Sequence, residues 1–216
     1  MQILETNIFG ENLQLHPFRA IYWQREKMLL LSDLHLGKAT HFRKAGIAVP
    51  KTLGDINWDK MASLLLDFQP NRVLFLGDLF HSDLNEEWEE FCQLTAQFSQ
   101  VQFELVPGNH DILFAEHYTA ARLLLHPPIV EIFPFLFSHH PLEVIPEHLY
   151  NLCGHIHPSV CLRGRGRQTL RLPCFYFGAN QGIMPAFGAF TGMAEVQPKN
   201  GDQVFVIAEE QVLKLD

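Results

Sequence analysis

The sequence predicts an α/β fold in which two mixed sheets pack face to face and helices cover their outer sides, a four-layer α/β/β/α sandwich. Apolar strand patterns alternate with helical patterns from residue 28 to 106, and this β-α-β-α-β order is typical of parallel strands covered by helices. Beyond residue 112 the chain is rich in strand patterns. The 216 residues are 47% hydrophobic and contain no repeat or linker, so we expect a single domain over residues 1–216.

The first half of the chain is expected to supply the parallel strands. Short strands are predicted at 13–15, 19–23 and 28–31. A helix is predicted from the N-cap candidate Asp55 to Phe68, since its apolar residues recur at helical spacing. The strand 72–76 follows. A second helix is predicted from the N-cap candidate Asn85 to Ser99, and then a strand at 101–106.

The second half is expected to form most of the other sheet. One helical stretch is predicted around residues 114–125. Strands are predicted at 129–133, 135–138, 149–153, 160–162, 169–172, 175–177, 204–209 and 212–215.

Composition limits the function classes. The net charge of −8 argues against broad, non-specific adhesion to nucleic acid, although bound divalent cations would cancel part of it. The four cysteines form no C-x-x-C pair, which indicates free thiols in a reducing compartment. No signal peptide and no apolar run of about 20 residues is present, so we expect a cytoplasmic protein without a membrane segment.

The stretch 107–111, Pro-Gly-Asn-His-Asp, carries the clearest chemical signal. Pro107-Gly108 breaks the strand 101–106 and places the next three residues beyond its carboxyl end, where ligands bind in open α/β sheets. An amide oxygen, an imidazole and a carboxylate side by side can serve a metal ion or a proton. Taken alone, the stretch can also be a loop that caps the next helix.

Four further strand ends carry similar side chains. The full set is Asp33-x-His35, Gly77-Asp78, Gly108-Asn109-His110-Asp111, Ser138-His139-His140-Pro141 and Gly154-His155-Ile156-His157. Each motif alone is weak evidence for a functional site, because a Gly-Asp turn or a His-x-His pair often has only a structural role. Together they offer carboxylates, imidazoles and an amide oxygen without thiolate, a mixture that suits manganese, iron or zinc.

The order of these motifs resembles the calcineurin-like metallophosphoesterase superfamily across residues 33–157. The resemblance implies a metal-dependent phosphoesterase with two divalent cations, and with a hydroxide between them as the nucleophile. It also implies two ligand sets that share one carboxylate: Asp33, His35, Asp78 and His157 for one cation, and Asp78, Asn109, His139 and His155 for the other.

The resemblance also implies roles for residues that do not bind the cations. His110 would stabilise the developing charge or protonate the leaving oxygen, and Asp111 would orient His110 by a hydrogen bond. Because strand alternation lets only one of His139 and His140 point inward, the family register selects His139.

A narrower likeness covers the stretches 33–50, 77–82, 172–178 and 184–192. They are similar to the DNA-ligase-associated phosphoesterases of bacterial DNA repair, called PdeM. This likeness implies a manganese-dependent phosphodiesterase or nuclease that works beside a DNA ligase and a helicase. A homodimer is compatible with the superfamily, although no apolar stripe identifies an interface.

Basic residues suggest how nucleic acid would be held. Arg163, Arg165 and Arg167 alternate with glycines between two predicted strands, so a hairpin tip behind His157 could grip phosphates. Lys38 and Arg43 follow the first motif and could flank the same cleft. The alternative is a solvated turn. Two other functions stay open: a phosphoesterase for a small substrate such as a cyclic nucleotide or a nucleotide-sugar lipid, and a scaffold without catalysis.

Overall fold

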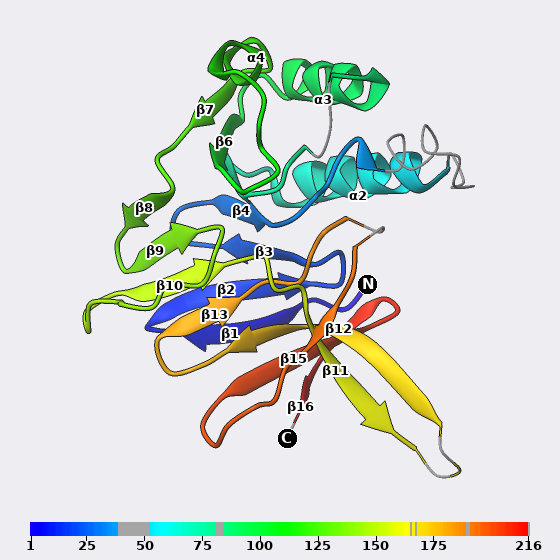
Figure 1. Ribbon diagram of the computed structural model, residues 1–216, viewed down its shortest axis with the longest axis vertical. Helices are drawn as coiled ribbons and strands as arrows, with labels where there is room; N and C mark the ends of the chain where they lie inside the picture. The colour runs from blue at the N-terminus through cyan, green and yellow to red at the C-terminus, as the bar shows by residue number, and fades with distance from the viewer. Residues whose placement is uncertain (39–51, 81–83, 165, 167, 189–190, 216) are drawn as a thin grey trace.

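The computed structural model describes residues 1–38, 52–80, 84–164, 166, 168–188 and 191–215, except for the side chains of residues 52–55. These residues form two mixed sheets that pack face to face, with the helices on one outer side (Figure 1). The predicted α/β fold with two mixed sheets is confirmed. The three labelled helices all cover the first sheet, so within the described residues the outer side of the second sheet carries no helical layer.

The first sheet contains seven strands in chain order. They are β1 (Leu4–Ile8), β2 (Glu11–His16), β3 (Ala20–Trp23), β4 (Met28–Leu31), β5 (Arg72–Leu76), β6 (Gln102–Val106) and β7 (Leu123–Leu125). Strands β1 to β4 are antiparallel neighbours, whereas β4 to β7 run parallel. The helices α2 (Thr52–Phe68), α3 (Glu86–Gln97) and α4 (Ala115–Ala120) connect these parallel strands, as the sequence pattern predicted.

The second sheet contains nine strands. They are β8 (Ile129–Ile132), β9 (Phe135–Ser138), β10 (Tyr150–Cys153), β11 (Pro158–Arg163), β12 (Thr169–Phe177), β13 (Gln181–Ile183), β14 (Ala194–Glu195), β15 (Gln203–Ala208) and β16 (Gln211–Leu215). Its central strands β9, β10 and β13 run parallel to one another. The carboxyl ends of β9 and β10 can therefore carry loops to the same edge.

Alternating side chains of the parallel strands fill two separate cores. Leu29, Leu31 and Phe75 pack with the helices, whereas Leu30 and Leu74 face the second sheet. Because neighbouring residues of a strand point to opposite faces, a strand buried on both sides must be apolar throughout. This explains the continuous apolar runs of β4 and β5.

The structure corrects the predicted stretch 114–125. The helix ends at Ala120, and Leu123–Leu125 forms strand β7, which pairs with β6. Three leucines fit a helix or a strand equally well by pattern, and the open edge of β6 decides for the strand. The N-cap of α3 is Asn85 as predicted, whereas α2 begins at Thr52 and includes Asp55.

Strand β12 joins two predicted strands. The segments 169–172 and 175–177 are predicted as separate strands, and Pro173 lies between them. Proline cannot donate to a ladder, but here it falls where β12 stops pairing with β11 and begins pairing with β15. Strands β1, β13 and β14 were not predicted, since they are short or polar.

Two predictions from composition can be compared with the structure. The four cysteines are free thiols. Within the described part of the chain, every helix is too short or too polar to cross a membrane.

His16 at the end of β2 makes the stability of the fold dependent on pH. Burial lowers the pKa of His16 to about 4, and its Nδ1 accepts the N–H of Phe18 at 3.0 Å. Between about pH 6.5 and 4, His16 is therefore protonated in the unfolded chain but neutral in the folded chain. The free energy of unfolding thus decreases as the pH falls through this window.

We expect the free energy of unfolding to lose about 2 kcal/mol from this group between about pH 7.5 and pH 5. The variant His16→Asn keeps an acceptor for Phe18 but does not titrate. Urea unfolding at both pH values should give it a shallower dependence on pH than the wild-type protein. Equal dependence in the two proteins would contradict this account.

Candidate metal centre

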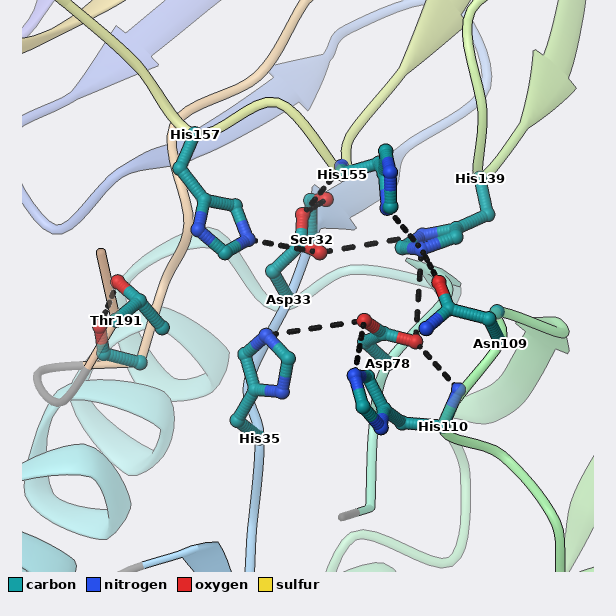
Figure 2. Close-up of polar contacts among 12 residues, drawn as sticks. Ser32, Asp33, His35, Asp78, Asn109, His110, His139, His155, His157 and Thr191 are labelled. Carbon is teal, nitrogen blue, oxygen red and sulfur yellow. Dashed lines mark hydrogen bonds and ion pairs between the residues drawn. The ribbon is translucent and has the colours of Figure 1, made fainter. Parts of the chain in front are cut away.

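The five predicted motifs come together at one edge of the two-sheet sandwich. They follow the carboxyl ends of β4, β5, β6, β9 and β10. Backbone hydrogen bonds join the loops, from Asp33 N to Gly77 O at 3.2 Å, from His35 N to Asp78 O at 2.8 Å and from Gly154 N to His139 O at 3.0 Å. The parallel strands of both sheets thus aim their loops at a single place (Figure 2).

Five side chains of the centre stand on unusual backbone. The φ angles of Asp33, His35, Asp78, His155 and His157 lie between 49° and 67°, in the left-handed region. This conformation costs a residue with a Cβ about 1–2 kcal/mol. Such strain persists where the surroundings impose it, and it gathers at functional sites.

Two glycines let the loops approach one another. A Cβ on Gly77, whose φ is 75°, would lie 2.2 Å from Nδ1 of His139. A Cβ on Gly108 would lie 2.3 Å from Oδ1 of Asp78. Side chains at these positions would push metal-ligand candidates out of place.

Asp33 and His157 face each other through two acceptor atoms. His157 Nδ1 lies 2.9 Å from the carbonyl oxygen of Gly192, so this nitrogen is the donor. His157 Nε2 lies 3.1 Å from Asp33 Oδ1. Both atoms are buried and have no hydrogen-bond partner among the described residues. A cation between them would satisfy both.

On the side of the second predicted cation, His139 is also oriented by a backbone carbonyl through one nitrogen and presents the other nitrogen to the centre. Its Nδ1 donates to Leu76 O at 3.0 Å, and its Nε2 lies 3.1 Å from Asn109 Oδ1 and 3.2 Å from His155 Nδ1. Burial alone would lower the pKa of His139, but Asp78 and Asp33 raise it overall. The Nε2 position therefore attracts positive charge, either a proton or a metal cation.

Asp78 lies between the two groups. Its Oδ2 is 3.8 Å from His35 Nε2, and its Oδ1 is 3.5 Å from His139 Nε2. Burial would raise the pKa of Asp78, yet His139 and the N–H of His110 hold it well below its usual range. The carboxylate is ionised and reaches both sides, as a bridging ligand must.

The donor set fits two divalent cations. Ligand atoms of Asp33, His35 and His157 lie within 4.8 Å of one another, and so do those of Asp33, Asp78 and His139. Burial lowers the pKa of His35 to about 3, so this imidazole is neutral, as metal binding requires. Carbonyl groups orient His139 and His157 by their second nitrogens, which is the usual support for metal-binding histidines.

His110 differs from the buried imidazoles around it. Its side chain is 40% exposed, against 5% for His35 and 1% for His139. Its Nε2 lies 4.0 Å from Asp78 Oδ2. A ring that borders the centre but opens to solvent can contact a substrate.

Asp111 accepts hydrogen bonds from backbone N–H groups and not, as was expected, from the His110 ring. Its Oδ1 accepts the N–H groups of Leu79 and Phe80 at 3.0 and 3.1 Å, and its Oδ2 accepts the N–H of Gly108 at 2.8 Å. Burial raises its pKa to about 6. The structure thus shows Asp111 fastening the loop after β5 to the loop after β6, which corrects the predicted hydrogen bond to the His110 ring.

The predicted substrate-binding residues fall in different places. Lys38 is near enough to Asp78 and Asp33 for their charges to oppose the lowering of its pKa by burial. Arg163 is exposed and is the last residue of β11, whose carboxyl end projects away from the helices in Figure 1. Arg43, Arg165 and Arg167 lie outside the described residues.

Some supporting groups were not predicted. Ser32 donates to Oδ2 of Asp33, and the carbonyls of Leu76 and Gly192 orient two histidines. Arg19, in the turn between β2 and β3, donates to Ala186 O at 2.9 Å. Backbone carbonyls carry no sequence signal, so only the folded chain could identify them.

Comparisons with known proteins identify a family and several similar structures. The model of the family described as calcineurin-like phosphoesterase matches residues 27–178. The crystal structure of Pseudomonas putida nuclease MPE is similar with a TM-score of 0.83 and 25% identity, over 99% of this chain and 100% of that chain. Yfce, a phosphoesterase from E. coli, is similar with a TM-score of 0.46 and 11% identity, over 87% of this chain and 97% of that chain. The search of curated proteins found no match.

The hydrogen bonds that Asp111 accepts predict that its replacement lowers the stability of the fold. The variant Asp111→Ala leaves three backbone N–H groups without their acceptor, and we expect it to lower the free energy of unfolding by about 3 kcal/mol. Asp111→Asn keeps one acceptor oxygen and should lose less. Urea unfolding of the metal-free proteins measures both changes. An alanine variant within about 0.5 kcal/mol of the wild-type protein would contradict the role.

Proposed function

Because the chain belongs to the calcineurin-like phosphoesterase family and is therefore a metal-dependent hydrolase of phosphoester bonds, we propose that it cleaves phosphodiester bonds in nucleic acid. Two divalent cations would serve the reaction, with manganese as the first candidate and iron or zinc as the others. The observation that carries the proposal is the position of Asp78, whose Oδ2 lies 3.8 Å from His35 Nε2 and whose Oδ1 lies 3.5 Å from His139 Nε2. Around it, two groups of closely spaced ligand atoms share Asp33.

Each part of the centre has a defined task in this reaction. When bound, the two cations would supply an activated water and neutralise charge on the phosphate oxygens. Asp33, His35, Asp78 and His157 would hold one, and Asp78, Asn109, His139 and His155 the other. His110, open to solvent beside Asp78, would donate a proton to the leaving oxygen or stabilise the charge that develops on phosphorus oxygens.

Basic residues favour a long, anionic substrate. The ammonium group of Lys38 places a positive charge near Asp78 and Asp33, where a phosphate would approach. Arg163 ends the six-residue strand β11, so it lies about 20 Å along that strand from the loop that holds His157. A single nucleotide at the metal centre would not reach it, whereas a nucleic acid chain would. The similarity to a protein described as a nuclease supports the same choice.

The cellular role is a wider part of the proposal. The likeness to the DNA-ligase-associated phosphoesterases supports DNA as the substrate and a place in bacterial DNA repair, in the cytoplasm. A DNA ligase and a helicase are the partners that this likeness implies, and a homodimer is the oligomer that we would look for first.

Two other functions are less well supported. A small-substrate phosphoesterase would not need the exposed arginine at the end of β11. A scaffold without catalysis would be expected to lack one or more ligands. In this chain all seven predicted ligands and His110 are present, and they lie together.

The first test is the hydrolysis of bis-p-nitrophenyl phosphate and of the corresponding monoester, with a labelled single-stranded DNA assayed in parallel. We expect cleavage of the diester and of the DNA with manganese, and loss of both activities when a chelator removes it. Diester cleavage with intact DNA would favour the small-substrate function. Inactivity with two cations bound would favour the scaffold.

Two variants show which residues the activity needs. Asp78→Asn should lose the bound cations, because it removes the shared carboxylate. His110→Ala should keep both cations yet lose turnover about 100-fold or more, the size usual for a lost proton-transfer group. Metal analysis of the purified variants separates the two effects. Full metal content with full activity in Asp78→Asn would contradict the two-cation assignment.

The proposed role of Arg163 predicts a change in the salt dependence of DNA binding. Arg163→Ala should weaken the binding of single-stranded DNA and reduce the slope of log affinity against log salt concentration by about 0.7, the value for one lost phosphate contact. Changing Arg165 and Arg167 as well should enlarge the effect. Diester hydrolysis should stay unchanged.

The matched control is Arg122→Ala, an exposed arginine beside β7. It should bind DNA with the wild-type slope. Equal losses of DNA cleavage and diester hydrolysis in Arg163→Ala would contradict a role in gripping DNA.

A further inference from the structure

We propose that His140 is a third imidazole available to the cation of Asp78, Asn109, His139 and His155, and that it gives this half of the centre a preference for zinc. The inference rests on the proposed two-cation centre and adds a residue and a metal preference to it. The other half, with Asp33, His35, Asp78 and His157, would keep the preference for manganese.

The local backbone allows both neighbouring histidines to serve one site. The expectation that only one of them points inward assumed a continuing strand. Strand β9 ends at Ser138, so the alternation of side chains no longer applies to the next two residues. The hydroxyl of Ser138 donates to His140 O at 2.7 Å and fixes the turn.

Three imidazoles gather at this turn. The ring centroids are 4.1 Å apart for His140 and His155, 4.7 Å for His139 and His140, and 4.9 Å for His139 and His155. One nitrogen from each ring lies within 4.8 Å of the others. This spacing is short enough for one cation to contact all three rings after small rotations of the side chains.

The three-histidine group differs in chemistry from the rest of the centre. The other two groups of possible ligands each contain at least one carboxylate, whereas this one contains imidazoles alone. Imidazole suits zinc, iron and copper, while carboxylate suits manganese and magnesium. A ligand set enriched in nitrogen on one side would therefore sort two different metals into the two halves.

His140 is also the accessible member of the group. His139 is buried, whereas His140 is exposed at the edge of the centre. An exposed ring can approach the cation or leave it without disturbing the core. Its removal should therefore spare the fold and the other ligands, which makes it a clean position for a test.

The experiment uses the full chain stripped of metal and titrated with zinc and with manganese by calorimetry. We expect His140→Ala to weaken zinc binding at one site at least tenfold. Loss of a group that only hydrogen-bonds to a metal ligand usually weakens metal binding by about 10-fold or more, so loss of a ligand should cost at least as much. Manganese binding should change less than threefold. His148→Ala, which alters an exposed histidine between β9 and β10, is the matched control and should bind both metals as the wild-type chain does.

X-ray absorption at the zinc edge adds a direct count of ligands. With one equivalent of zinc, we expect three imidazoles in the wild-type protein and two in His140→Ala. Two imidazoles in both proteins, with equal zinc affinity, would overturn the assignment of His140 and leave the two-cation centre in place. If the wild-type chain bound no divalent cation, the proposed function would fail as well.

Discussion

The crowding of acceptor atoms around Asp33 and Asp78 is the constraint on which the rest of the structure depends. Carboxylate oxygens and imidazole Nε2 atoms lie 3.1 to 3.8 Å apart in a largely buried place, where like-signed partial charges repel. The chain holds them there with backbone hydrogen bonds between loops. It also accepts left-handed backbone at five of the residues concerned. Such an arrangement is stable only if positive charge completes it.

The two-sheet architecture explains how this crowding is enforced. Each sheet contributes parallel strands whose carboxyl ends face the same edge, and the apolar core between the sheets fixes their separation. Trp23 and Phe135, packed edge to face at 4.9 Å, join the two sheets directly. The loops then need little freedom, since Asp111 fastens two of them and Gly77 and Gly108 remove the side chains that would keep them apart.

The basic groups around the centre lie at different distances from it. His110 and His140 border it, Lys38 lies near its carboxylates, and Arg163 stands at the end of a strand that leads away from it. Under the proposed function, the chemistry at the centre and the binding of a long substrate at Arg163 can therefore be altered separately.

The sequence by itself determined the parallel strands 28–31 and 72–76, the helix capped by Asn85, and the metal-ligand candidates. Their signals are local: continuous apolar runs, a capping side chain, and polar residues directly after strands. Only the tertiary structure decided that Leu123–Leu125 is a strand, because the open edge of β6 outweighs a pattern that fits either element. It also decided what Asp111 binds and how His139 and His140 are placed. These depend on groups far apart in the chain, and on the end of β9 at Ser138, and no spacing in the sequence records them.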